Sequence, residues 1–74
     1  MKREDLIRMG NDIAAFFASY PDEEAVAGVA DHLKKFWEPR MRAQLLDIIS
    51  DGAAEASPLL LKAAARLERP AQPA

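Results

Sequence analysis

Hydrophobic and polar positions follow a helical period along most of the chain, beginning near the N-terminus. Between residues 3 and 19, hydrophobic side chains recur three or four positions apart and charged ones fall mostly between them. This spacing predicts an amphipathic helix over about residues 3–19, with these residues inward: Leu6, Met9, Ile13, Phe16 and Phe17. Because adjacent helical residues project about 100° apart, Phe16 and Phe17 cannot both enter one narrow seam. Together with the alanines beside them they predict a wide apolar arc that covers a second surface.

A second amphipathic helix is predicted from about Pro21 to Trp37. Proline suits the first helical position, and the three acidic residues 22–24 place negative charge at the positive end of the helix dipole. Its apolar stripe consists of Val26, Val29, Ala30, Leu33, Phe36 and Trp37. Gly28 lies in mid-helix, where glycine costs about 1 kcal/mol relative to alanine. We therefore expect Gly28 to permit the close approach of another helix.

Proline and glycine mark the remaining boundaries. Pro39 cannot continue a helix and disfavours the helical conformation of Glu38, which predicts a corner at residues 37–39. A third helix is predicted from about Pro39 to Ser50, with Gly52 as its C-terminal stop. Its inward residues are Met41, Leu45, Ile48 and Ile49. An N-cap at residue 57 followed by proline at 58 opens a short fourth helix, predicted to run through about Leu67.

The pattern as a whole predicts an all-α fold. We expect a small bundle of three main helices plus a short fourth helix, because no segment shows the alternation of a strand and no internal repeat is present. Residues 1–67 are predicted to form a single helical domain. Residues 68–74 contain two prolines and no apolar anchor, so a disordered C-terminal tail is predicted there.

Size and composition favour association with another protein. The chain has 74 residues and no cysteine, and a core in a chain below about 70–80 residues rarely contributes more than about 3–5 kcal/mol. Disulfides and thiolate metal sites are excluded, and a zinc site based on the single histidine would need carboxylates for its other ligands. A partner is the remaining means of stabilisation, which predicts a subunit of a larger assembly.

The net charge and the hydropathy of the chain limit which partners and which cellular location are expected. The net charge of −2 and the pI near 5.3 argue against general attraction to nucleic acid or to an anionic membrane. No apolar run approaches the ~20 residues that span a bilayer, and the first residues lack the pattern of a cleavable signal. A cytoplasmic location is predicted.

Motifs for autonomous catalysis are missing from the sequence. It contains no GxSxG elbow, no phosphate-binding loop, no HExxH and no Cys/His pair. His32 is expected on the polar shoulder of the second helix, as an exposed or capping residue. We therefore predict no active site, no catalytic residue and no metal ligand in this chain.

The stretch DHLKKFWEPRMRAQLL, residues 31–46, gathers four cations around the one tryptophan. Lys34 and Lys35 fall in the last turn of the second helix, where the dipole favours positive charge. Arg40 and Arg42 fall in the first turn of the third helix, where the dipole disfavours it, so these two are the better candidates for a functional contact. Trp37 either closes the core or anchors a partner, and the sequence leaves both readings open.

The same residues resemble a known family. The run FFASYPDEEAVAGVADHLKKFWEPRMRAQL, and HxxKFWxPRMR within it, resembles the delta subunit of bacterial NAD-dependent, molybdenum- or tungsten-containing formate dehydrogenases, over essentially residues 5–67. The resemblance implies a small helical protein without a cofactor in a cytoplasmic complex. It further implies an alpha subunit with a bis-molybdopterin guanine dinucleotide centre (Mo or W) and iron–sulfur clusters. Beta and gamma subunits with FMN and further clusters are implied in the same complex.

The resemblance also implies a role and a set of contact residues. We expect a non-catalytic accessory subunit that docks on the catalytic alpha subunit and supports assembly, stability or cofactor maturation. The predicted partner-binding residues are His32, Lys35, Trp37, Arg40, Met41 and Arg42. Phe36 and Pro39 match the same motif and are expected to hold the fold. The alternative is a small helical nucleic-acid-binding module that uses the basic corner Lys34–Arg42.

Overall fold

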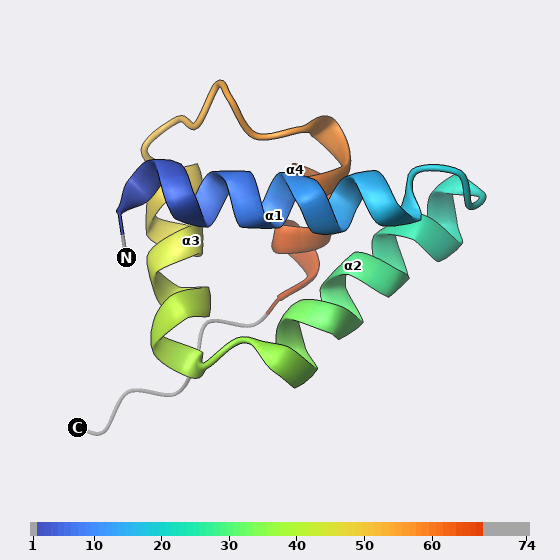
Figure 1. Cartoon of the computed structure of the whole chain (residues 1–74), viewed down its shortest axis with the longest axis horizontal. Coiled ribbons are helices and arrows are strands. Elements are labelled where there is room, and N and C mark those ends of the chain that lie inside the picture. Colours follow the sequence, from blue (N-terminus) through green and yellow to red (C-terminus); the bar gives the residue numbers. More distant parts are fainter. Residues whose placement is uncertain (1, 68–74) are drawn as a thin grey trace.

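Four helices account for most of the chain. The computed structural model describes residues 2–67. They form α1 (Arg3–Phe17), α2 (Asp22–Phe36), α3 (Pro39–Ser50) and α4 (Pro58–Arg66), with no strand among them (Figure 1). The prediction of an all-α fold with three main helices and a short fourth is confirmed. The predicted disordered tail, residues 68–74, lies outside the described residues.

The capping and helix-breaking residues of the sequence predicted each helix end to within two residues of its position in the structure. Pro21 stands just before α2 and its carbonyl accepts a 2.8 Å hydrogen bond from the Ala25 amide. Ser57 caps α4, because its Oγ accepts from the Leu60 amide at 3.1 Å. Gly52 ends α3 with a left-handed φ of 92°, a conformation that glycine adopts without steric cost. The predictions for Ser57 and Gly52 are confirmed, whereas Pro21 lies one residue before the first helical position for which it was predicted.

The helices pack around one apolar core. α2 makes its most extensive contacts with α4 and then with α1, and α1 also packs against α3 and α4. In Figure 1, α1 crosses in front of α4, while α2 and α3 lie below α1 and approach each other at the link that joins them. The largest fully buried side chains come from all four helices: Leu6, Val29, Leu33, Leu45 and Leu60. Burial of each contributes about 1.5–3 kcal/mol, so no helix is dispensable.

Two aromatic residues predicted to lie inward are exposed instead. Phe16 is 70% exposed and Phe36 is 73% exposed, so the prediction that both face the core is wrong. Each is adjacent to a second aromatic ring, and only one ring of each pair can occupy the interior. Phe17 packs against the core and Trp37 is buried within it. Among residues 2–67, Ile7 and Ala14 also join the core, although the pattern did not single them out.

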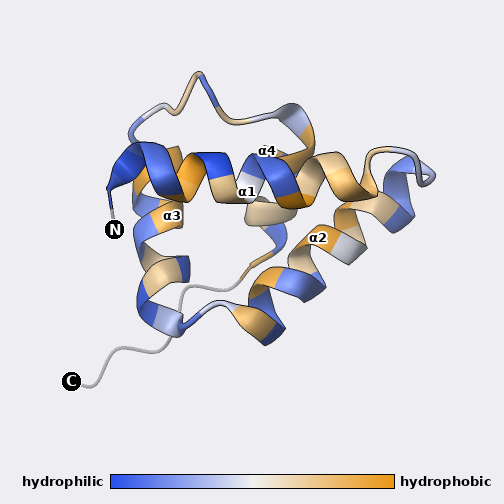
Figure 2. Ribbon diagram, viewed as in Figure 1, coloured by the Kyte–Doolittle hydropathy of each residue, from blue (hydrophilic) through white to orange (hydrophobic). Residues whose placement is uncertain are grey.

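Gly28 permits the close packing of α1 on α2, as predicted. A Cβ added at Gly28 would lie 2.6 Å from a ring carbon of Phe17, far inside van der Waals contact. Glycine therefore creates the space that the Phe17 ring fills. Figure 2 shows the wide hydrophobic region at the C-terminal half of α1, the half that carries both phenylalanines.

Candidate docking surface

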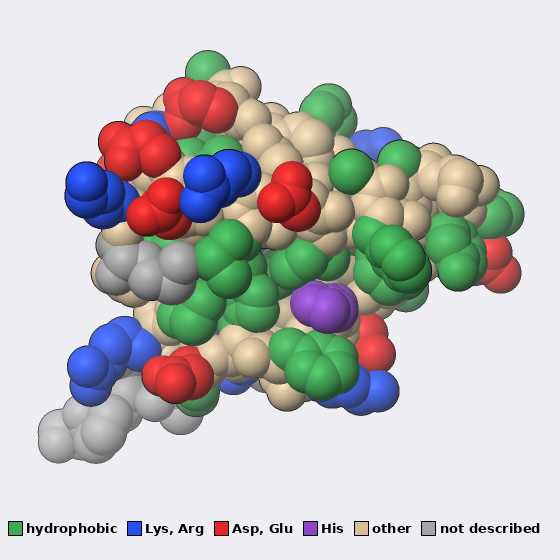
Figure 3. Space-filling model, in the orientation of Figure 1, with side chains coloured by type: hydrophobic (Ala, Val, Ile, Leu, Met, Phe, Trp, Pro, Cys, Tyr) green, Lys and Arg blue, Asp and Glu red, His purple; other side chains and the backbone are tan. Residues whose placement is uncertain are grey.

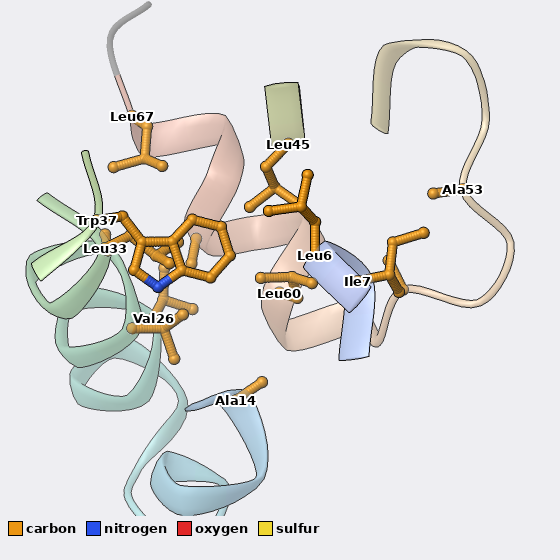
Figure 4. Close-up of a cluster of buried hydrophobic side chains, with 14 residues drawn as sticks. Leu6, Ile7, Ala14, Val26, Leu33, Trp37, Leu45, Ala53, Leu60 and Leu67 are labelled. Carbon is orange, nitrogen blue, oxygen red and sulfur yellow. The ribbon is translucent and has the colours of Figure 1, made fainter. Parts of the chain in front are cut away.

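The corner between α2 and α3 is built around a buried tryptophan. Trp37 and Glu38 have extended backbones, with ψ of 139° and 149°, and Pro39 opens α3. Only 6% of the Trp37 surface is exposed. Its indole points into the core cluster beside Leu33 and Leu67 (Figure 4). Of the two readings of Trp37, the structure supports closure of the core, and little of the ring is left for a partner.

Arg42 holds the same corner from the other side. Its Nη1 donates to the Trp37 carbonyl at 2.6 Å and to the Lys34 carbonyl at 3.2 Å. Carbonyls of a last helical turn have no partner within their own helix and carry its negative dipole end. Arg42 therefore caps α2 across the corner. This gives its unfavourable position in the first turn of α3 a structural reason, which the sequence reasoning missed because it considered only the dipole of α3.

Two of the four cations of the corner are already engaged by other groups of the protein. Lys35 pairs with Asp31 at 3.1 Å, and Arg42 is engaged by backbone carbonyls. Arg40 and Lys34 are exposed, and neither side chain forms an ion pair within residues 2–67. Met41 is partly buried against the core. Of the six predicted partner-binding residues, Arg40 is therefore the one that presents a free charge to solvent.

A shallow apolar depression lies between α1 and α2. We call it the aromatic notch, and it is lined by Asp12, Ile13, Phe16, Phe17 and His32, with a volume of about 290 Å³. The Phe36 ring extends it, because it stacks on His32 with centroids 4.7 Å apart and a tilt of 40°. Figure 3 shows the single histidine surrounded by hydrophobic side chains on this face.

The notch brings together residues that the sequence reasoning had treated separately. His32 was predicted to contact a partner and does lie in the notch, half-buried, beside residues of α1. Phe16 and Phe36 were assigned to the core. The sequence does contain a sign of their exposure, because residues 16–17 and 36–37 are pairs of adjacent aromatic residues. Adjacent helical residues project in different directions, so one ring of each pair is expected to face outward. Large exposed aromatic surface on a small protein is typical of an interaction site.

Neither a metal-binding cluster nor a membrane-spanning helix is present in the geometry of residues 2–67. Within residues 2–67, no three His, Cys, Asp or Glu side chains gather in a way that could hold a metal ion. None of the helices in that part of the chain is long and apolar enough to cross a bilayer.

Comparison with known proteins gives one family. The family described as NADH-dependent formate dehydrogenase delta subunit (FdsD) matches residues 5–64 of this chain. Neither the curated proteins nor the solved structures provided a match. The family match spans all four helices and contains the corner and the aromatic notch.

Proposed function

This chain belongs to the NADH-dependent formate dehydrogenase delta subunit family, and we propose that it is a non-catalytic accessory subunit that docks on the catalytic alpha subunit. Membership of the family implies a multi-subunit formate dehydrogenase complex. Docking on the alpha subunit, support of its assembly, stability or cofactor maturation, and a cytoplasmic location for the complex are parts of the proposal. The family match over residues 5–64 is the observation that carries it.

Two features of the fold support the proposal. The core is small and has no disulfide, so contact with a larger protein is an effective source of stability. Phe16 and Phe36 leave most of their rings in solvent, and aromatic residues are enriched in protein interfaces. A partner that covered them would remove apolar surface from water on both sides of the contact.

The chemistry of the enzyme is assigned to other chains in this proposal. The alpha subunit would carry the bis-molybdopterin guanine dinucleotide centre, with molybdenum or tungsten, and iron–sulfur clusters. The beta and gamma subunits would carry FMN and further clusters. This chain contributes a fold and a surface, and we propose that it holds no cofactor and no active site of its own.

The six predicted partner-binding residues fall into two groups, according to whether their side chains are accessible or are held within the fold. Among the six predicted from the sequence, Arg40, His32 and Lys35 reach solvent or the notch and remain candidates for direct contact. Trp37, Met41 and Arg42 would act through the shape of the corner, because they are buried, packed against the core or bound to carbonyls. The nucleic-acid alternative gains no support from the comparisons, and two of its four cations, Lys35 and Arg42, are already engaged by Asp31 and by backbone carbonyls.

Co-purification tests the proposed function. The chain, carrying an affinity tag, is expressed together with the alpha subunit, and the tag alone serves as the control. We expect the alpha subunit to elute with the tagged chain and not with the tag alone. Recovery of the alpha subunit in the unbound fraction, with the tagged chain retained and folded, would refute docking.

A further inference from the structure

The aromatic notch has the dimensions of a socket for side chains. Its volume of about 290 Å³ matches only the lower end of the range of about 300–1,000 Å³ typical of small-molecule pockets, and it is open to solvent. Rings of both helices surround it, Phe16 and Phe17 from α1 and His32 from α2, with Phe36 stacked at the edge. The anchor residues that dominate protein interfaces are large side chains that fill apolar pockets on the partner.

One charged group stands at the notch. Asp12 lines it, and the Asp12 carboxylate forms no ion pair with any other residue between 2 and 67. The neighbouring acidic residue of α1, Asp5, is already paired with Arg8. The notch therefore presents apolar rings beside an unneutralised negative charge.

That charge discriminates between possible occupants. A second copy of the chain in a symmetric contact would bring two Asp12 carboxylates to the same interface, because the same patch meets itself. Like charges brought together in this way oppose association. Nucleic acid and anionic membrane are disfavoured by the same carboxylate. A partner segment with a cation beside its apolar anchor is complementary to the notch, because the anchor matches the apolar rings and the cation matches the Asp12 carboxylate.

We propose that the aromatic notch binds a segment of the alpha subunit in which a large apolar side chain is flanked by a lysine or arginine. The apolar side chain enters between Phe16 and Phe36, and the cation pairs with Asp12. Arginine has a further advantage, because its guanidinium stacks on aromatic faces such as the two exposed rings. This inference rests on the proposed function and specifies the surface and the chemistry that docking would use.

The test measures the dissociation constant of the complex between the purified alpha subunit and variants of this chain. The double variant Phe16→Ser/Phe36→Ser should bind at least about tenfold more weakly, as removal of interface anchors does. Leu61→Ser is the matched control, since Leu61 is also an exposed hydrophobic residue but lies on α4, and should bind within about twofold of wild type. Circular dichroism of each variant verifies that the helices are intact.

Charge variants test the notch without altering its apolar surface. Asp12→Lys should raise the dissociation constant about two- to fivefold relative to the wild-type chain. This effect should shrink as the salt concentration rises. Asp12→Asn should fall between Asp12→Lys and wild type. Tighter binding by Asp12→Lys would mean that the partner segment is acidic, and it would overturn the proposed chemistry.

The outcomes separate this inference from the proposed function. Failure of the wild-type chain to bind the alpha subunit removes both. Wild-type binding that survives in Phe16→Ser/Phe36→Ser leaves docking in place and refutes the notch. Sedimentation measures the oligomeric state of the isolated wild-type chain and of the double variant. If the wild-type chain is a dimer and the double variant is a monomer, a second copy covers the notch, and the proposal is refuted.

Discussion

Replacement of Arg42 by methionine should destabilise the isolated chain, because it removes the cap of α2. Methionine keeps most of the side-chain length and loses both bonds from Nη1, to the Trp37 carbonyl at 2.6 Å and to the Lys34 carbonyl at 3.2 Å. A hydrogen bond to a charged group contributes about 1.5–3 kcal/mol. Since one nitrogen serves both carbonyls and the second bond is exposed, we expect a total loss of about 2 kcal/mol.

Urea unfolding followed by circular dichroism measures this loss. A decrease of about 2 kcal/mol lowers the unfolding midpoint by about 1–2 M for a small protein. Arg40→Met is the matched control, because Arg40 is exposed and forms no ion pair within residues 2–67. It should change stability by no more than about 0.5 kcal/mol. Equal midpoints for Arg42→Met and Arg40→Met would refute the cap.

Substitutions at three further positions test the packing of α1 and the start of α4, each by urea unfolding. Gly28→Ala should cost about 1–3 kcal/mol, because its Cβ would fall 2.6 Å from the Phe17 ring; a gain in stability would contradict this contact. Ser57→Ala should cost about 1 kcal/mol by removing the cap of α4, and Ser57→Thr should restore part of it. Asn11→Ala should cost about 1–3 kcal/mol, because the Ser57 amide loses its acceptor at 2.8 Å; an unchanged midpoint would show that this bond is dispensable.

Local chemistry explains why the helix boundaries were predictable. Pro39, Gly52, Ser57 and Pro58 act through their own backbone preferences, which require no knowledge of the rest of the fold. The structure places each of them as expected. The family resemblance was equally accessible, because a run with Trp, Pro and Arg in fixed register is itself a sequence property, and the family match over residues 5–64 confirms it.

The orientation of the aromatic side chains depended on packing between helices. Residue 28 is a glycine, and the space beside it accepts Phe17, so Phe16 is left outside. At the end of α2, the turn that precedes Pro39 directs Trp37 into the core and leaves Phe36 outside. Periodicity within one helix cannot choose between adjacent rings, since the choice is made by the neighbouring helix. The aromatic notch was missed for this reason.

The role of the Arg42 charge, like the orientation of the aromatic rings, could not be predicted from one helix alone. Its position in α3 conflicts with the dipole of its own helix, and the sequence reasoning took this as a sign of partner contact. The side chain reaches back to carbonyls five and eight residues earlier, which a corner brings within range. An interaction between two helix ends is invisible until their relative placement is known.

The proposal to be tested is that this chain supports the assembly, stability or cofactor maturation of the enzyme. The most direct measurement is expression of the other formate dehydrogenase subunits with and without this chain, followed by assay of formate oxidation and of molybdenum or tungsten per alpha subunit. We expect omission to lower the yield, the metal content or the activity of the assembled enzyme, and co-expression of the chain to restore what was lost. Unchanged yield, metal content and activity in the absence of the chain would contradict it.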